Sequence, residues 1–179
     1  MIKNIKSIVL GAFASVICAI ALIGTIHAQS AAPMTDAQIA RIRLNCVSAK
    51  NTVAQLHASD ALLRVNRGQI YESMTTKLMK PFNDRASSNH FDTSGLTLAI
   101  QNYDSMLTTF RTDYQSYEEQ LSNALNIDCS KEPVAFYDAV SLARTLRSQV
   151  HVDVTRLNQY IDDYDTVLNV FINTEVAGK

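Results

Sequence analysis

The sequence predicts an all-α protein: an elongated antiparallel three-helix coiled-coil bundle (up-down-up) behind an N-terminal signal or anchor helix. Three observations predict this fold. Apolar residues recur at alternating steps of four and three along three long segments, Gly and Pro are almost absent inside those segments, and a pair of cysteines falls where antiparallel helices would meet. A sustained seven-residue apolar repeat winds helices around a shared seam, so we expect a bundle over residues 36–175.

The N-terminus has the layout of a secretory signal. Lys3 and Lys6 precede an uncharged apolar run over residues 7–26, and the small residue Ala28 follows at the expected cleavage point. A membrane span needs about 20 apolar residues, so retention of the same run as an anchor in the cytoplasmic membrane is the alternative. We therefore expect residues 1–28 to be a signal peptide or membrane anchor, and the protein to be extracytoplasmic, secreted or held in the cell envelope.

Two cysteines remain once the signal is removed, Cys46 and Cys129. An exported chain folds in an oxidising compartment, so the simplest expectation is a disulfide between them. The bond would join the early part of the first helix to the end of the second, which suits antiparallel packing. Two free buried thiols are the alternative.

The first helix is predicted over about residues 36–80, after a short tether at 29–35. Thr35 and Gln38 form a capping-box pattern at its start, and Pro81 is expected to end it. The spacing of four and three gives a seam with two charged interruptions: Ile39, Ile42, Cys46, Ala49, Val53, Leu56, Asp60, Leu63, Arg67, Ile70 and Met74.

The second helix, predicted over about 95–127, carries the clearest repeat. Every successive seam position is apolar or aromatic, a run too long to expect by chance in a chain that is 47% hydrophobic. These positions are Leu96, Ile100, Tyr103, Leu107, Phe110, Tyr114, Tyr117, Leu121 and Ala124.

The third helix is predicted over about 133–173, with Pro133 in its first turn, where a missing backbone N–H is tolerated. Only Arg147 interrupts its apolar seam. The seam positions are Phe136, Val140, Ala143, Arg147, Val150, Val154, Leu157, Ile161, Tyr164, Leu168 and Phe171.

Asp60 and Arg147 are charges of opposite sign at seam positions. Counted from the disulfide they lie at similar heights on the first and third helices, level with Tyr114 and Tyr117 on the second. We expect an ion pair in a largely desolvated seam that fixes the register of the helices. A site for a charged ligand within the rod, or a widened seam that uses the tyrosines to hold a ligand, is the alternative.

A basic stripe runs beside the first seam. We expect it to face the acidic residues that flank the second seam, as flanking charges do in coiled coils, and an acidic partner or anionic lipid is the alternative. The basic residues are Arg43, Lys50, His57 and Arg64, and the acidic ones are Asp104, Asp113 and Glu118.

The connection between the first two helices, from Pro81 to Gly95, is polar apart from Phe82 and Phe91. Exposed aromatic residues at a loop tip can mark a partner contact, and rings that cap the end of the core are the alternative. We expect this turn to be the most mobile part of the rod.

No pattern indicates catalysis, a cofactor or a metal. The sequence has no glycine-rich phosphate loop, no Gly-x-Ser-x-Gly motif and no His-x-x-x-His or Glu-x-x-His pair. A formal net charge of −1 also lacks the basic excess of nucleic-acid-binding domains. We therefore expect a noncatalytic protein without a cofactor, a metal or a nucleic-acid partner.

Two stretches carry a family resemblance. Residues 56–69 (LHASDALLRVNRGQ) and 132–140 (EPVAFYDAV) resemble segments of uncharacterised exported helical proteins of Saccharibacteria and related candidate-phylum bacteria. The resemblance implies an extracytoplasmic helical protein and assigns no activity or functional residues. By association alone it favours a role at the envelope or cell surface.

The leading functional expectation is a noncatalytic envelope or cell-surface scaffold, an interaction module whose rod presents a face or its distal turn to another envelope or surface protein. The alternative is an extracytoplasmic binding protein or chaperone that holds an apolar ligand or client in an aromatic groove between helices. Membrane contact is expected only through the N-terminal segment, if it stays uncleaved.

Overall fold

The structure, a computed structural model, describes residues 33–177, in which all regular structure is helical. The prediction of an all-α protein is confirmed for this part of the chain. The predicted signal or anchor at 1–28 and the start of the tether lie outside it. The elements are α1 (Asp36–Leu44), α2 (Cys46–Ser73), the π-helical turn η1 (Met74–Met79), α3 (Lys80–Ser88), α4 (Ser94–Asn126), α5 (Pro133–Phe171) and the π-helical turn η2 (Ile172–Val176).

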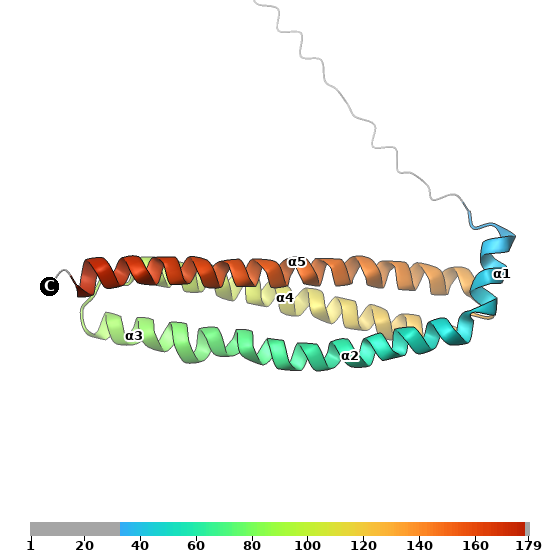
Figure 1. Cartoon of the computed structure of the whole chain (residues 1–179), viewed down its shortest axis with the longest axis horizontal. Coiled ribbons are helices and arrows are strands. Elements are labelled where there is room, and N and C mark those ends of the chain that lie inside the picture. The colour runs from blue at the N-terminus through green and yellow to red at the C-terminus, as the bar shows by residue number, and fades with distance from the viewer. Residues whose placement is uncertain (1–32, 178–179) are drawn as a thin grey trace, which may run out of the picture. The chain divides into compact units, whose positions relative to one another are not determined.

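Three long helical stretches lie side by side (Figure 1). The first consists of α2, η1 and α3 in unbroken succession, and it packs against α4. The contact between α4 and α5 is the most extensive, whereas α2 approaches the backbone of α5 only weakly. At 1.5 Å per residue, α5 is about 58 Å long.

Burial is most regular in α4. All of its predicted seam residues, from Leu96 to Ala124, are buried, and Tyr103 and Leu107 are almost completely enclosed. An apolar stripe on a helix is buried against its neighbours, and α4 supplies more buried residues than any other helix of the described part of the chain. The heptad prediction for this segment is confirmed.

The first predicted helix is interrupted at Asn45. The capping box forms as expected, with the Gln38 side chain accepting from the Thr35 N–H at 2.8 Å. At Asn45, however, the side-chain amide donates to the Arg41 carbonyl at 2.8 Å, and the backbone leaves the helical region at φ −100° and ψ 8°. Asparagine side chains compete for backbone groups in this way, so α1 ends here and α2 begins at an angle to it (Figure 1).

Pro81 does not end the first helix, contrary to the sequence prediction. It is the second residue of α3, which continues to Ser88. Just before it the backbone is in π register, with the Lys80 N–H bonded to the Thr75 carbonyl five residues back. A π turn widens the helix and shifts its hydrogen bonds, which makes room for a proline ring that would otherwise clash with the preceding turn.

The predicted seam of the first helix is followed only as far as Asp60. Leu63 and Ile70 were expected to be buried and are exposed, and Arg67, at the seam position between them, is exposed as well. Burial resumes at Tyr71, eleven residues after Asp60, and continues through α3. An eleven-residue step is about three turns of an α-helix, so Tyr71 lies on nearly the same face of the helix as Asp60 but outside the predicted heptad frame, and residues 61–70 contribute no buried side chain.

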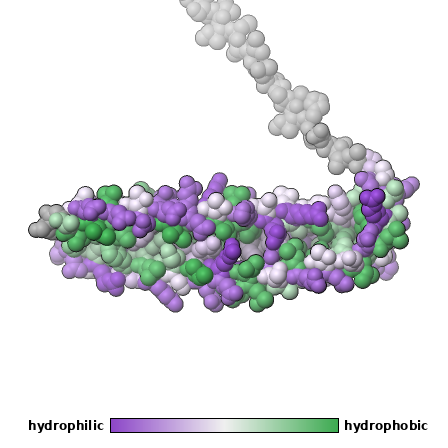
Figure 2. Space-filling view, viewed as in Figure 1, coloured by the Kyte–Doolittle hydropathy of each residue, from purple (hydrophilic) through white to green (hydrophobic). Residues whose placement is uncertain are grey.

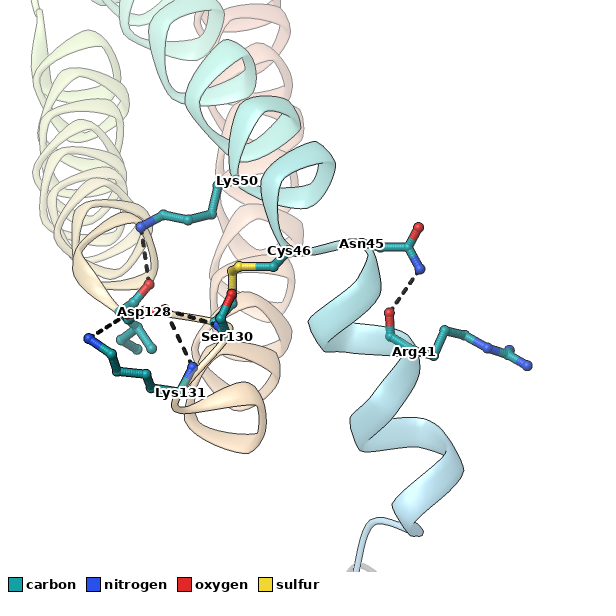
Figure 3. Close-up of a disulfide and its surroundings, with 9 residues drawn as sticks. Arg41, Asn45, Cys46, Lys50, Asp128, Ser130 and Lys131 are labelled. Atoms are coloured by element: carbon teal, nitrogen blue, oxygen red, sulfur yellow. Dashed lines mark hydrogen bonds and ion pairs between the residues drawn. A yellow bond between two sulfur atoms is a disulfide. The ribbon is translucent and has the colours of Figure 1, made fainter.

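The disulfide joins Cys46, at the start of α2, to Cys129, in the connection between α4 and α5 (Figure 3). The two Cα atoms are 5.5 Å apart, and both residues are buried. Beside it, Lys50 donates to the Ile127 carbonyl at 3.1 Å. The bond spans 83 residues of chain, and closing so long a loop stabilises by about 4 kcal/mol on the chain-entropy model.

The opposite end of the helical unit closes with a tight turn over residues 89–93, shorter than the predicted connection. The Phe91 N–H bonds to the Ala86 carbonyl at 3.2 Å, and the His90 N–H bonds to the Ser87 carbonyl at 2.9 Å. This pairing is a Schellman motif, and His90 has the φ of 63° that the motif requires. Glycine is the usual residue at such a position, since a side chain there is strained.

We expect His90→Gly to raise the free energy of unfolding by about 0.5–1 kcal/mol, the relief of left-handed strain less the extra entropy of glycine in the unfolded chain. Denaturant titration measures the change. Ser88→Gly, in the right-handed last turn of α3, is the control and should lower the stability by about 0.5–1 kcal/mol. Equal losses in both variants would contradict the assignment of strain to His90.

Candidate functional site

The structure brings Asp60 and Arg147 together, as the heptad positions and the disulfide predict. The Arg147 Nε donates to Asp60 Oδ2 at 2.9 Å, and its Nη2 lies 3.4 Å from Oδ1. The Tyr117 hydroxyl donates to the same Oδ2 at 2.7 Å. One carboxylate from α2 therefore joins a phenol from α4 and a guanidinium from α5.

The pair is not uniformly desolvated, which corrects the sequence prediction. Asp60 is 9% exposed, whereas the Arg147 side chain is 52% exposed. Burial by itself raises the pKa of Asp60, but the hydrogen bonds from Arg147 and Tyr117 outweigh it and hold that pKa below the usual range. Burial, followed by the bond to Asp60, raises the pKa of Tyr117, so its hydroxyl remains a donor at physiological pH.

The basic stripe meets its predicted acidic partners only in part. His57 and Arg64 both approach Glu118, at 3.8 and 3.7 Å. Asp104 instead accepts from Thr75 at 2.7 Å and pairs with Lys80 at 2.7 Å.

Phe82 and Phe91, the predicted partner contacts, both pack edge to face against Phe171, with ring centroids 5.9 Å apart in each case. Both are half-buried and lie against the core cluster at this end of the unit. This packing accounts for two apolar residues in a polar turn. Contact of either ring with another protein stays a prediction.

A groove opens between α2 and α5, with α4 as its floor. Its volume is about 430 Å³, within the range of sites that hold small ligands. It occurs where residues 61–70 of α2 bury nothing against α4 and α5. Figure 2 shows this side, where apolar and hydrophilic surface lie next to each other along α2 and α5. The lining residues are Asp60, Leu63, Arg64, Arg67, Phe110, Tyr114, Tyr117, Arg144, Arg147, Ser148, Val150, His151 and Val154.

The walls of the groove are basic. Four arginines and one histidine line it against a single carboxylate, that of Asp60. Arg147 is paired with Asp60, and Arg64 lies 3.7 Å from Glu118. Arg67 and Arg144, from opposite walls, make no ion pair with any described residue.

The floor of the groove is aromatic. Tyr114 and Tyr117 meet edge to face at 6.0 Å, and Phe110 lies 6.3 Å from Tyr114. The Arg64 guanidinium sits over the Tyr114 ring at 4.8 Å. Burial, helped by Glu118, raises the pKa of Tyr114 to about 12, so this phenol stays neutral.

A buried carboxyl group, which lies against a second, half-buried one, was not predicted from the sequence. Asp153 of α5 is fully buried, and it lies against Asp113 of α4. Gln149 donates to its Oδ1 at 3.0 Å, while Oδ2 has no hydrogen-bond donor. Burial is the main reason why the pKa of Asp153 is raised. The second reason is Asp113: two ionised carboxylates cannot donate to each other, so a hydrogen bond between them requires that one carboxyl group keeps its proton.

A second heptad frame in the third segment would have identified Asp153. Starting at Ala139, the same steps of four and three lead through Ala143, Leu146 and Val150 to Asp153. Both frames share every other position, and the apolar pattern alone does not choose between them.

No cluster of three or more metal-ligating side chains occurs within residues 33–177. In the same range, no helix has both the length and the apolar content needed to cross a membrane. Comparisons with protein-family models, curated proteins and solved structures found no match to this chain. The candidate site therefore has to be interpreted from its own geometry.

We expect Arg147→Leu to lower the free energy of unfolding at neutral pH by about 1.5–3 kcal/mol, the range for hydrogen bonds to a charged group. The folded-state pKa of Asp60 is depressed, so this stabilisation is present above the unfolded pKa and is lost as the pH falls through the folded one. The difference from wild type, measured by denaturant titration, should therefore shrink below about pH 4.

The control for this variant is Arg144→Leu, one turn earlier on the same helix and without an ion-pair partner. It should change the stability by less than about 0.5 kcal/mol. A loss in Arg147→Leu that is the same at every pH would mean that Asp60 is not its electrostatic partner.

We expect Asp153→Asn to raise the free energy of unfolding at neutral to mildly alkaline pH by about 1–3 kcal/mol, because it removes a buried charge with an unsatisfied oxygen. The folded-state pKa is raised, so the wild type is penalised above that pKa and recovers as the pH falls toward the unfolded value. The gain should therefore vanish near pH 4. Asp163→Asn, exposed on the same helix, should have little effect, and an equal gain there would refute the explanation.

Proposed function

We propose that this chain is a noncatalytic exported helical rod, an antiparallel three-helix coiled coil that acts as an envelope or cell-surface scaffold by binding another protein. Its N-terminal segment would direct export and then be cleaved or remain as an anchor. A buried disulfide is compatible with an extracytoplasmic location, where such bonds persist.

The observation that carries the proposal is the exposed middle of α2. Ten consecutive residues, 61–70, contribute no buried side chain, although several of them are aliphatic. Leu62 is 68% exposed, Val65 53% and Ile70 59%. Contiguous exposed apolar residues on a helix are typical of a surface that another protein covers.

A second candidate function has its own support. The groove beside α2 combines a volume of about 430 Å³, an aromatic base and two arginines without an ion pair among residues 33–177, which favours an extracytoplasmic binding protein for a small ligand. The two functions differ in what the purified protein should retain: a protein partner in the first case and a small molecule in the second.

We expect the chain, purified from its native envelope extract, to elute in size exclusion with one protein partner in a fixed ratio. The paired variant Leu62→Ser with Ile70→Ser should lose most of that partner, because it removes exposed apolar area without disturbing the core.

The control pair is Leu98→Ser with Val170→Ser, which are 60% and 58% exposed on α4 and α5. This control should keep the partner. An equal loss in both pairs, or no partner of fixed ratio, would contradict a scaffold that binds through α2.

A further inference from the structure

We propose that the groove between α2 and α5 binds a small amphipathic anion, a molecule with an apolar or aromatic body and one carboxylate, phosphate or sulfonate group. The inference rests on the second candidate function above and specifies its ligand class. The scaffold surface shares residues 61–70 with one wall of the groove, but it is tested by variants at Leu62 and Ile70, which lie outside the groove lining.

The anionic half of the ligand follows from the charges. Arg67 and Arg144 face the groove from its two walls without an ion-pair partner among residues 33–177. Guanidinium groups bind carboxylate and phosphate through paired N–H donors. Such charge-assisted hydrogen bonds are stronger than hydrogen bonds between neutral groups. Arg67 and Arg144 line the same groove from its two walls, and we infer that both bind the anionic group of one ligand.

The carboxylate of Asp60 does not oppose such a ligand. It is neutralised by Arg147 and accepts the Tyr117 hydroxyl, and it is 9% exposed. The charge that the groove presents to solvent is therefore positive.

The apolar half of the ligand follows from the apolar side chains that line the groove. Phe110, Tyr114 and Tyr117 form the base of the groove but are only 2–5% exposed, so the apolar surface open to a ligand comes mainly from Leu63 on α2 and from Val150 and Val154 on α5. Burial of an apolar group against these side chains is favourable. A site with cations at its rim and aliphatic side chains along its walls selects molecules that carry both features, which neither a simple ion nor a neutral hydrocarbon does.

The size of the groove sets the size of the ligand. A volume of about 430 Å³ is near the lower end of small-ligand sites. It accommodates a bicyclic aromatic ring or a short acyl chain together with its anionic group. A folded protein domain would cover the groove rather than enter it.

The test uses 8-anilinonaphthalene-1-sulfonate, an anionic naphthalene dye, titrated into the full purified chain and followed by fluorescence. We expect saturable binding of one dye per chain. Arg67→Gln with Arg144→Gln should weaken it by at least about tenfold, as expected for losing two charge-assisted bonds.

The matched control is Arg43→Gln with Arg85→Gln, two exposed arginines outside the groove, which should bind the dye as wild type does. 1-Naphthyl phosphate should displace the dye, and inorganic phosphate at the same concentration should not. Equal binding by both paired variants, or equal displacement by inorganic phosphate, would overturn the proposal. Recovery of the protein partner is measured in a separate experiment, so the result of the dye titration neither supports nor contradicts the scaffold proposal.

Discussion

The carboxylate of Asp60 links the three long helical stretches, because it accepts hydrogen bonds from the other two. It comes from α2, its hydroxyl donor comes from α4 and its cation comes from α5. Apolar seams tolerate sliding by whole heptads, because one leucine layer packs much like the next. A carboxylate that must meet both a phenol and a guanidinium permits one register only. The disulfide fixes the same register from the end of the unit, two heptads away.

Beyond Asp60 the first stretch leaves its heptad frame, and the groove lies beside this part of α2. The eleven-residue step to Tyr71 leaves about three turns of α2 without a buried side chain. Those turns carry exposed aliphatic residues, and within residues 33–177 Arg67 makes no ion pair. Packing resumes farther along, where the Tyr103 hydroxyl donates to the Tyr71 carbonyl at 2.9 Å and Met79 is almost fully enclosed. A segment with few buried contacts is expected to open more easily than the packed parts of the same helix.

The sequence analysis predicted well wherever one period governs burial. The α4 seam follows a single frame from Leu96 to Ala124, and Asp60 lies in the same frame as Cys46, so their relative heights could be counted. The sequence analysis failed where the backbone departs from the regular hydrogen-bond pattern of an α-helix. The π turn at Met74–Met79 and the break at Asn45 depend on hydrogen bonds that hydropathy does not report. Asp153 was missed because two frames in α5 share alternate positions, and only tertiary packing decides which one is buried.

The placement of the disulfide has a mechanical consequence for a rod that is held at both ends. Tension applied between residues 33 and 177 enters the covalent loop at Cys46 and leaves it at Cys129, whose Cα atoms are 5.5 Å apart. The force bypasses α2, α3 and α4, which lie inside the loop and carry no tension, so only α1, α5 and the ends of the chain can be drawn out. The fully stretched chain would then reach about 210 Å, instead of about 490 Å without the bond. The disulfide therefore limits how far the chain can extend, and reduction would release the remaining length.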